Sequence, residues 1–221
     1  MVTTRGRPQG HLTPAKSTPR KGEWAHSPSN LSIIWLLISL PLVMWDTGYV
    51  MLRPHSMPGG SLHWPLWVPY ELYCEMDYIY GWKAFNEHNG FTAAQTMLNI
   101  IETAMYIYYL YIVYAYGRPS TSHQRGASKP STAAVLGQQR AAVMTVSKTV
   151  LYWLNEYFSG FANIGHNDTP RLLLWAVSNG AWIIVPSYII YLTGNDILRG
   201  LTVAAGGATS SSDDTSLVKT E

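Results

Sequence analysis

Polar side chains recur at helical spacing inside an apolar stretch of this sequence, residues 91–116. They are Gln95, Asn99, Glu102, Tyr106 and Tyr109, which follow one another at intervals of 4, 3, 4 and 3 positions. This spacing places them on one face of an α-helix. An ionisable residue inside an apolar segment is costly, so Glu102 is a candidate functional residue.

Three further apolar stretches supply matching groups. Residues 172–193 carry Trp175, Asn179, Trp182 and Pro186 at intervals of 4, 3 and 4 positions. Asp46 lies in residues 31–52, and Glu156 lies near one end of residues 141–158. At 1.5 Å per residue, Asp46, Glu102 and Asn179 lie roughly 9–15 Å below the same predicted membrane boundary, with Glu156 above them.

We therefore predict one polar cavity. Its catalytic candidates are Asp46 and Glu102, and its ligand-binding candidates are Asn179, Trp182, Glu156, Asn99, Tyr106 and Trp175. Burial favours the neutral form of a carboxyl group, which can then act as a general acid. The π face of Trp182 can stabilise a cation, although packing explains this residue equally well. Interhelical hydrogen bonding is an equally good explanation for Asn179.

The four stretches also indicate the fold class. Together they contain only four charged residues, and each is about as long as a membrane-crossing helix. Trp and Tyr near their ends favour a membrane over the alternative, buried helices of a soluble all-α protein. We predict an all-α integral membrane protein, a four-transmembrane-helix bundle with helices at about 31–52, 91–116, 141–158 and 172–193. Lys148, in the third helix, should extend toward the membrane boundary and carries no assigned chemistry.

The tails and loops give the domain organisation and orientation. We predict a disordered basic tail over residues 1–29, a membrane domain over 30–195 and a flexible tail over 196–221. Basic residues concentrate in the first tail and in residues 117–140, so both tails and this loop should be cytosolic. We expect a multi-pass protein of the endoplasmic reticulum with both termini in the cytosol.

Composition excludes several function classes. The chain has 15 Lys and Arg against 13 Asp and Glu, a net charge of +2, which is small for a nucleic-acid-binding protein. The single cysteine excludes a disulfide framework. The seven histidines show no metal-ligand spacing, and no phosphate-binding or dinucleotide-binding motif occurs. We expect no cofactor and no metal. The expected partners are the lipid bilayer and a hydrophobic small molecule, with a homodimer left open.

The segment LYWLNEYFSGF (residues 151–161), the later Gly165-His166 pair and NGAWIIVP (residues 179–186) resemble the emopamil-binding sterol isomerases of the EXPERA-domain family. The resemblance covers residues 31–195, and residues 81–103 look typical of fungal relatives. It implies a four-helix membrane unit that shifts a sterol double bond without an organic cofactor.

The resemblance also implies roles for single residues. Asp46 and Glu102 match the family's carboxylates, and Asn179 and Trp182 match its asparagine and its cation-stabilising tryptophan. Leu42 stands where the family has a histidine, one helical turn from Asp46. Met105 replaces a hydroxyl residue one turn after Glu102.

Four functions are compatible with these residues. The leading hypothesis is an isomerase that protonates and deprotonates a sterol or terpenoid alkene in an intramembrane cavity. The second is a non-catalytic protein that binds sterols or cationic amphiphiles, which the absence of the family histidine favours. An acid-initiated terpenoid cyclase and a structural partner in the endoplasmic reticulum are the remaining alternatives.

Overall fold

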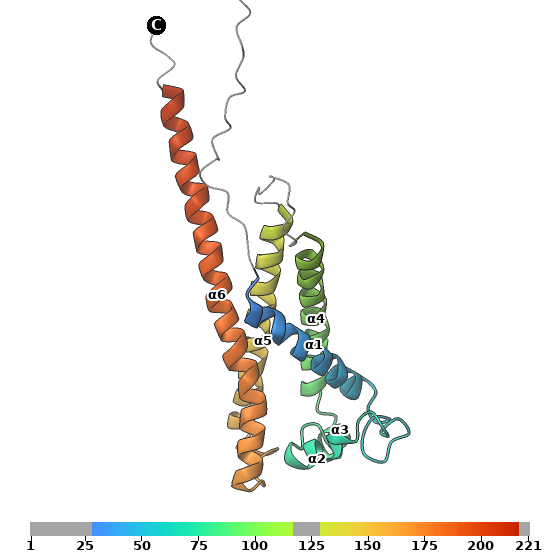
Figure 1. The fold of residues 1–221 in the computed structure, drawn as a ribbon. Helices are drawn as coiled ribbons and strands as arrows, with labels where there is room; N and C mark the ends of the chain where they lie inside the picture. Colours follow the sequence, from blue (N-terminus) through green and yellow to red (C-terminus); the bar gives the residue numbers. More distant parts are fainter. Residues whose placement is uncertain (1–27, 117–128, 217–221) are drawn as a thin grey trace, which may run out of the picture.

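The computed structural model describes residues 28–116 and 129–216 and, within them, every regular element is helical (Figure 1). The elements are α1 (Asn30–Met51), α2 (Pro69–Met76), α3 (Trp82–Asn86), α4 (Phe91–Tyr116), α5 (Lys129–Phe158) and α6 (Thr169–Ser216). The all-α prediction is thus confirmed for the described residues. Most of the predicted N-terminal tail and part of the loop over residues 117–140 lie outside them.

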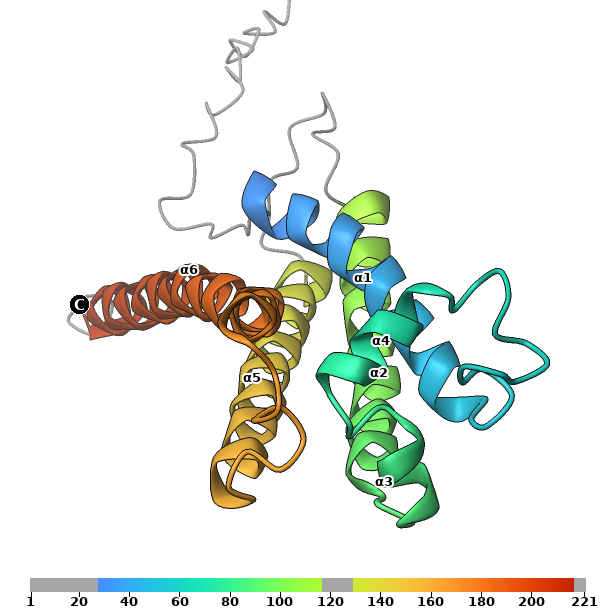
Figure 2. The same cartoon turned by 90° about the horizontal axis from the view of Figure 1, so that it is seen from below.

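The four long helices pack in the order α1, α4, α5, α6. α1 crosses α4 obliquely, whereas α4 and α5 run side by side (Figures 1 and 2). α2 and α3 lie together at one end of the bundle, and α6 extends well beyond the other helices at the opposite end (Figure 1). The indole rings of Trp35 and Trp182 meet at a centroid distance of 5.1 Å, which links α1 to α6.

The predicted polar stripe on α4 faces the interior. Asn99, Glu102, Tyr106 and Tyr109 are all buried, and Gln95 is half-buried. Their spacing keeps them on the side of α4 that meets its neighbours, while large apolar side chains between them face outward. The sequence periodicity therefore predicted the rotation of α4 about its own axis.

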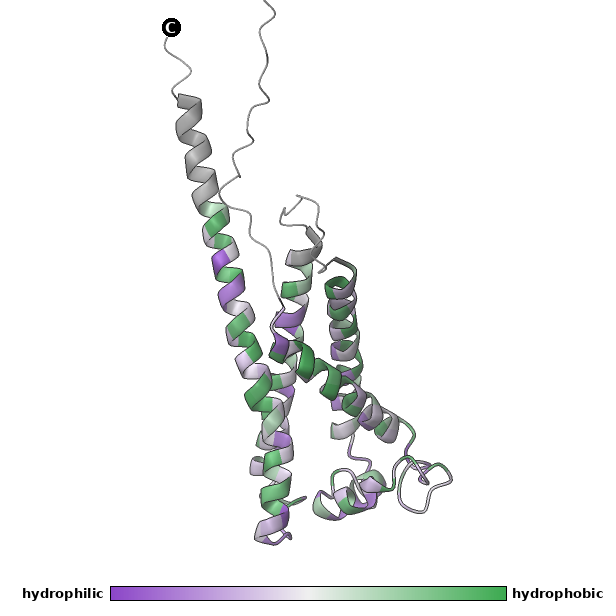
Figure 3. Cartoon of the chain, viewed as in Figure 1, coloured by the Kyte–Doolittle hydropathy of each residue, from purple (hydrophilic) through white to green (hydrophobic). Residues whose placement is uncertain are grey.

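Three helices are long and apolar enough to cross a membrane among the described residues: Asn30–Met51, Phe91–Ala115 and Thr169–Ala205. Their outward-facing side chains are apolar as well, and α1 is hydrophobic along most of its length (Figure 3). A helix that is apolar on its exposed face as well as on its packed face is typical of membrane proteins. These three helices suggest a membrane protein.

α5 is the exception among the four predicted membrane helices. It begins at Lys129, well before the expected start of its apolar stretch, and its first half adds Gln138, Gln139 and Arg140. This polar half lowers the hydropathy of the helix, visible as alternating colours in Figure 3. Its crossing of the membrane stays a prediction.

α6 continues past the predicted end of the fourth helix at Thr193 and is helical to Ser216. The helix thus includes most of residues 196–221, which we expected to be a flexible tail. No proline follows Pro186 in α6, and the glycines after it weaken a helix by about 1 kcal/mol each without breaking it.

Candidate functional site

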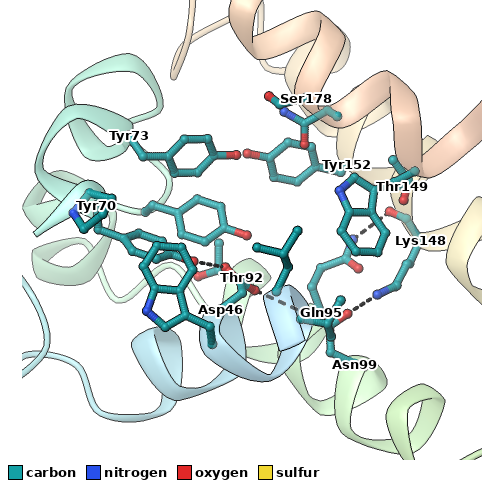
Figure 4. Close-up of a pocket in the computed structure, with 17 residues that line it drawn as sticks. Asp46, Tyr70, Tyr73, Thr92, Gln95, Asn99, Lys148, Thr149, Tyr152 and Ser178 are labelled. Carbon is teal, nitrogen blue, oxygen red and sulfur yellow. Dashed lines mark hydrogen bonds between the residues drawn. The ribbon is translucent and has the colours of Figure 1, made fainter. Parts of the chain in front are cut away.

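A cavity of about 390 Å³ lies between the four long helices, at the end of the bundle where α2 packs (Figure 4). This volume is within the range of roughly 300–1,000 Å³ that is usual for small-molecule sites. Six aromatic side chains form much of its wall: Trp45, Tyr70, Tyr73, Tyr80, Tyr152 and Trp182. The cavity is therefore suited to a ligand with apolar, flat surfaces.

Asp46 lies at the wall of this cavity, where α1 passes α2. Its Oδ1 accepts a hydrogen bond of 2.5 Å from the Tyr70 hydroxyl group, and its Oδ2 accepts one of 3.5 Å from Asn99 Nδ2 (Figure 4). It is the only acidic residue among the described residues that line the cavity. Two donors from different elements thus hold a single carboxyl group at an aromatic wall.

Lys148 enters the cavity from α5, so the expectation that it extends to the membrane boundary is wrong. Its ammonium group donates to Asn99 Oδ1 and lies 3.1 Å from Glu102 Oε2. Both charged side chains are nearly buried, with 10% of Lys148 and 3% of Glu102 exposed. The ion pair compensates the positive charge that Lys148 brings to the wall.

Glu102 therefore lies behind the cavity and does not line it. Its Oε1 accepts a 2.7 Å hydrogen bond from the Thr145 hydroxyl group, which lies 3.3 Å from the Tyr106 hydroxyl group. Tyr106 shares this buried position. Glu102 and Tyr106 form a polar layer between α4 and α5, next to the candidate site.

Asn179 and Trp182 line the cavity from α6, as predicted. Asn179 Nδ2 donates to the carbonyl oxygen of Trp175 at 2.9 Å, which fixes the orientation of the amide. Of the eight predicted site residues, the structure brings these two together with Asp46 and Asn99 around one cavity.

Glu156 and Trp175 lie elsewhere. Glu156 is buried at the end of α5, where it accepts a 2.6 Å hydrogen bond from Asn163 Nδ2 and a 3.3 Å bond from the Asn163 backbone N–H. It holds the loop that follows α5. Trp175 is buried in α6 and donates from Nε1 to Asp77 Oδ2 at 2.7 Å.

Asp77 is a buried carboxyl that sequence reasoning missed. It follows α2, has no exposed surface, and accepts hydrogen bonds from Trp175 Nε1, the Tyr152 hydroxyl group and the Ile79 backbone N–H. Burial raises the pKa of Asp77, and the hydrogen bonds from Tyr152 and Trp175 act in the opposite direction.

A signal for this group is present in the sequence. Tyr70, Tyr73, Asp77 and Tyr80 follow one another at intervals of 3, 4 and 3 positions, the same pattern that identified the stripe on α4. The segment lies between the first two predicted membrane helices, where this periodicity alone does not predict burial. The three tyrosines line the cavity, and Asp77 lies behind them.

No cluster of three or more His, Cys, Asp or Glu side chains among the described residues has a geometry that could hold a metal ion. No protein-family model, curated protein or solved structure matches this chain. The resemblance to the EXPERA-domain family stays a prediction from the residues quoted for it.

Proposed function

We propose that this protein is a membrane-embedded isomerase that shifts a double bond in a sterol or terpenoid by protonation and deprotonation. The observation that carries the proposal is the position of Asp46, whose carboxyl group lies at the aromatic wall of a cavity of about 390 Å³ and is the one acid that lines it among the described residues. Proton transfer from a carboxyl group to an alkene produces a carbocation, which requires shielding from water and a wall that tolerates positive charge.

The cavity wall supplies groups that tolerate positive charge. Its six aromatic side chains bring apolar surface for a polycyclic ligand and π faces for a cation. Trp182 contributes one of these faces and is held edge-on by Trp35. The hydroxyl group of Tyr70 and the amide of Asn99 orient the Asp46 carboxyl group, so little reorganisation is needed during proton transfer.

In this reaction Asp46 gives its proton to one alkene carbon, and the adjacent carbon becomes cationic. Loss of a proton from a neighbouring carbon then forms the shifted double bond, so that no net proton is consumed. Glu102 pairs with the ammonium group of Lys148 and compensates its charge, a role that differs from the proton transfer predicted for it from sequence.

We also propose a cellular location and a membrane topology for the protein. A multi-pass protein with four membrane-spanning helices, residing in the endoplasmic reticulum with both termini in the cytosol, would present this cavity to ligands dissolved in the bilayer. The three long apolar helices support the membrane part of this proposal.

Rescue of cells that lack sterol isomerase tests the function. We expect the wild-type chain to restore sterol profiles and Asp46→Asn to fail, because the amide has no acidic proton to give. Glu71→Gln, on the exposed face of α2, is the matched control and should rescue like the wild type. Rescue by Asp46→Asn at the wild-type level would contradict the proposal.

A second candidate, a non-catalytic protein that binds cationic amphiphiles, is favoured by one observation. Glu102 is already paired with Lys148, and Leu42 lines the cavity one turn from Asp46. Among the described residues, Asp46 is thus left as the single acid facing a ligand. An amine would pair with this carboxylate and pack on the aromatic wall. Tight amine binding that Asp46→Asn weakens, without any rescue by the wild type, would favour this candidate.

A further inference from the structure

The buried carboxyl group of Asp77 reaches the cavity through one side chain. Asp77 has no exposed surface, and its Oδ2 accepts from both Trp175 Nε1, at 2.7 Å, and the Tyr152 hydroxyl group. Tyr152 lines the cavity, whereas Asp77 does not. The Tyr152 hydroxyl group thus joins Asp77 to the cavity by a direct hydrogen bond.

Aromatic neighbours fix the position of the Tyr152 ring at the cavity. Its ring lies between those of Phe91 and Trp175, at centroid distances of 6.1 Å and 5.9 Å. Its hydroxyl group points toward that of Tyr73 at the cavity (Figure 4). Tyr152 and Asp46 thus approach the cavity from α5 and α1, two different helices.

We propose that Tyr152, backed by Asp77, is the second proton-transfer group of this cavity and removes the proton that the carbocation loses. This inference rests on the proposed isomerase function. The C–H bond breaks and its electron pair forms the new double bond. Its proton moves to the Tyr152 oxygen as the Tyr152 hydroxyl proton moves to the Asp77 carboxylate. In this scheme Tyr152 is catalytic and Asp77 is a positioning residue that also stores the proton.

Before the next turnover Asp46 takes up a new proton from water, and tyrosine side chains line the cavity wall beside it. The Tyr73 and Tyr80 rings lie 5.0 Å apart, the Tyr80 and Tyr70 rings 6.1 Å apart, and Tyr70 donates to Asp46. Burial raises the pKa of Tyr73 and of Tyr80, so both phenols stay protonated and neutral beside the ligand. One proton enters the ligand from Asp46 and one leaves through Tyr152, which balances the isomerisation.

The Asp77 contacts also join three elements, so loss of Asp77 is expected to weaken the fold. The test must therefore use a readout that a purely structural role would not move. A primary isotope effect on the carbon that loses its proton is such a readout, because it reports how far proton removal limits the rate.

The experiment uses the purified full chain in lipid vesicles with a Δ8 sterol, unlabelled or deuterated at the allylic carbon that loses its proton. We expect Tyr152→Phe and Asp77→Asn to lower kcat by about 10²–10⁴-fold at nearly unchanged KM. Both variants should show a larger isotope effect than the wild type. Tyr157→Phe, an exposed tyrosine of the same helix, should leave kcat and the isotope effect unchanged.

Two results would overturn the inference alone: wild-type kcat in Tyr152→Phe, or a lower kcat with an unchanged isotope effect in both variants. Absence of turnover by the wild type on the Δ8 sterol and on a panel of terpenoid alkenes would overturn the proposed function and this inference with it. These outcomes are distinguishable because only the last affects every variant alike.

Discussion

The ion pair between Glu102 and Lys148 gives the sharpest prediction about the structure. The two charged groups are 3.1 Å apart, and their side chains are almost completely buried. At an effective dielectric constant of about 20, Coulomb's law gives roughly 5 kcal/mol for this separation. Removing one partner of a buried pair typically costs about 3–5 kcal/mol. We therefore expect Glu102→Gln to lower the free energy of unfolding by about 3–5 kcal/mol.

The double variant Glu102→Gln/Lys148→Met separates stability from chemistry. Replacing both charges with neutral side chains of similar size removes the uncompensated charge, so most of the stability should return. A double-mutant cycle should show an interaction energy of about 3 kcal/mol. If Glu102 acts only by pairing Lys148, the double variant should also keep most of the isomerase activity.

Denaturant unfolding in detergent and product formation in vesicles are the two assays. Glu75→Gln is the matched control, because Glu75 pairs with Arg171 at 3.8 Å on the surface and should cost no more than about 1 kcal/mol. Additive single effects would show that the pair has no mutual stabilisation. A stable double variant that is inactive, when Lys148→Met alone stays active, would refute the reassignment of Glu102.

Three further predictions concern the cavity, the buried acid and the topology. Trp182→Leu should slow turnover about 2–30-fold, because it removes a cation–π contribution of about 0.5–2 kcal/mol, while Trp64→Phe, at an exposed position, should not. Burial raises the pKa of Asp77 above 3.8, so its contribution to stability is complete below about pH 3.8 and is lost as the pH rises through its folded pKa. Thermal unfolding of the wild type should show this decline from about pH 4 to pH 8, and that of Asp77→Asn should not. Tags at the two termini should both be accessible from the cytosol in intact microsomes, and protection of one of them would contradict a four-span arrangement.

Helical periodicity was enough to predict much of the site. Asn99 on α4 and both Asn179 and Trp182 on α6 face the interior because each lies on a stripe with intervals of three and four residues. Asp46 followed from its isolation in an apolar run. Periodicity fixes the rotation of a helix about its own axis, which is the information that Asn99, Asn179 and Trp182 required.

The positions of Glu102, Glu156 and Asp77 depend on how separate helices and loops pack against one another. Glu102 lies behind the cavity because Lys148 of α5 faces it, and no single helix pattern sets which residues of two helices meet. Glu156 accepts from Asn163, which a loop folds back to its side. Asp77 lies in a segment whose charged residues indicate exposure to water. Its burial depends on the packing of α2 on the end of the bundle.

Protonation by Asp46 of an alkene in a ligand held in this cavity leaves a label that can be measured. The most direct measurement is the mass spectrum of product formed from a Δ8 sterol by the purified chain in D₂O. We expect one deuterium at the protonated carbon with the wild type, and no labelled product with Asp46→Asn. Labelled product formed equally by Asp46→Asn, or isomerised product without deuterium, would contradict it.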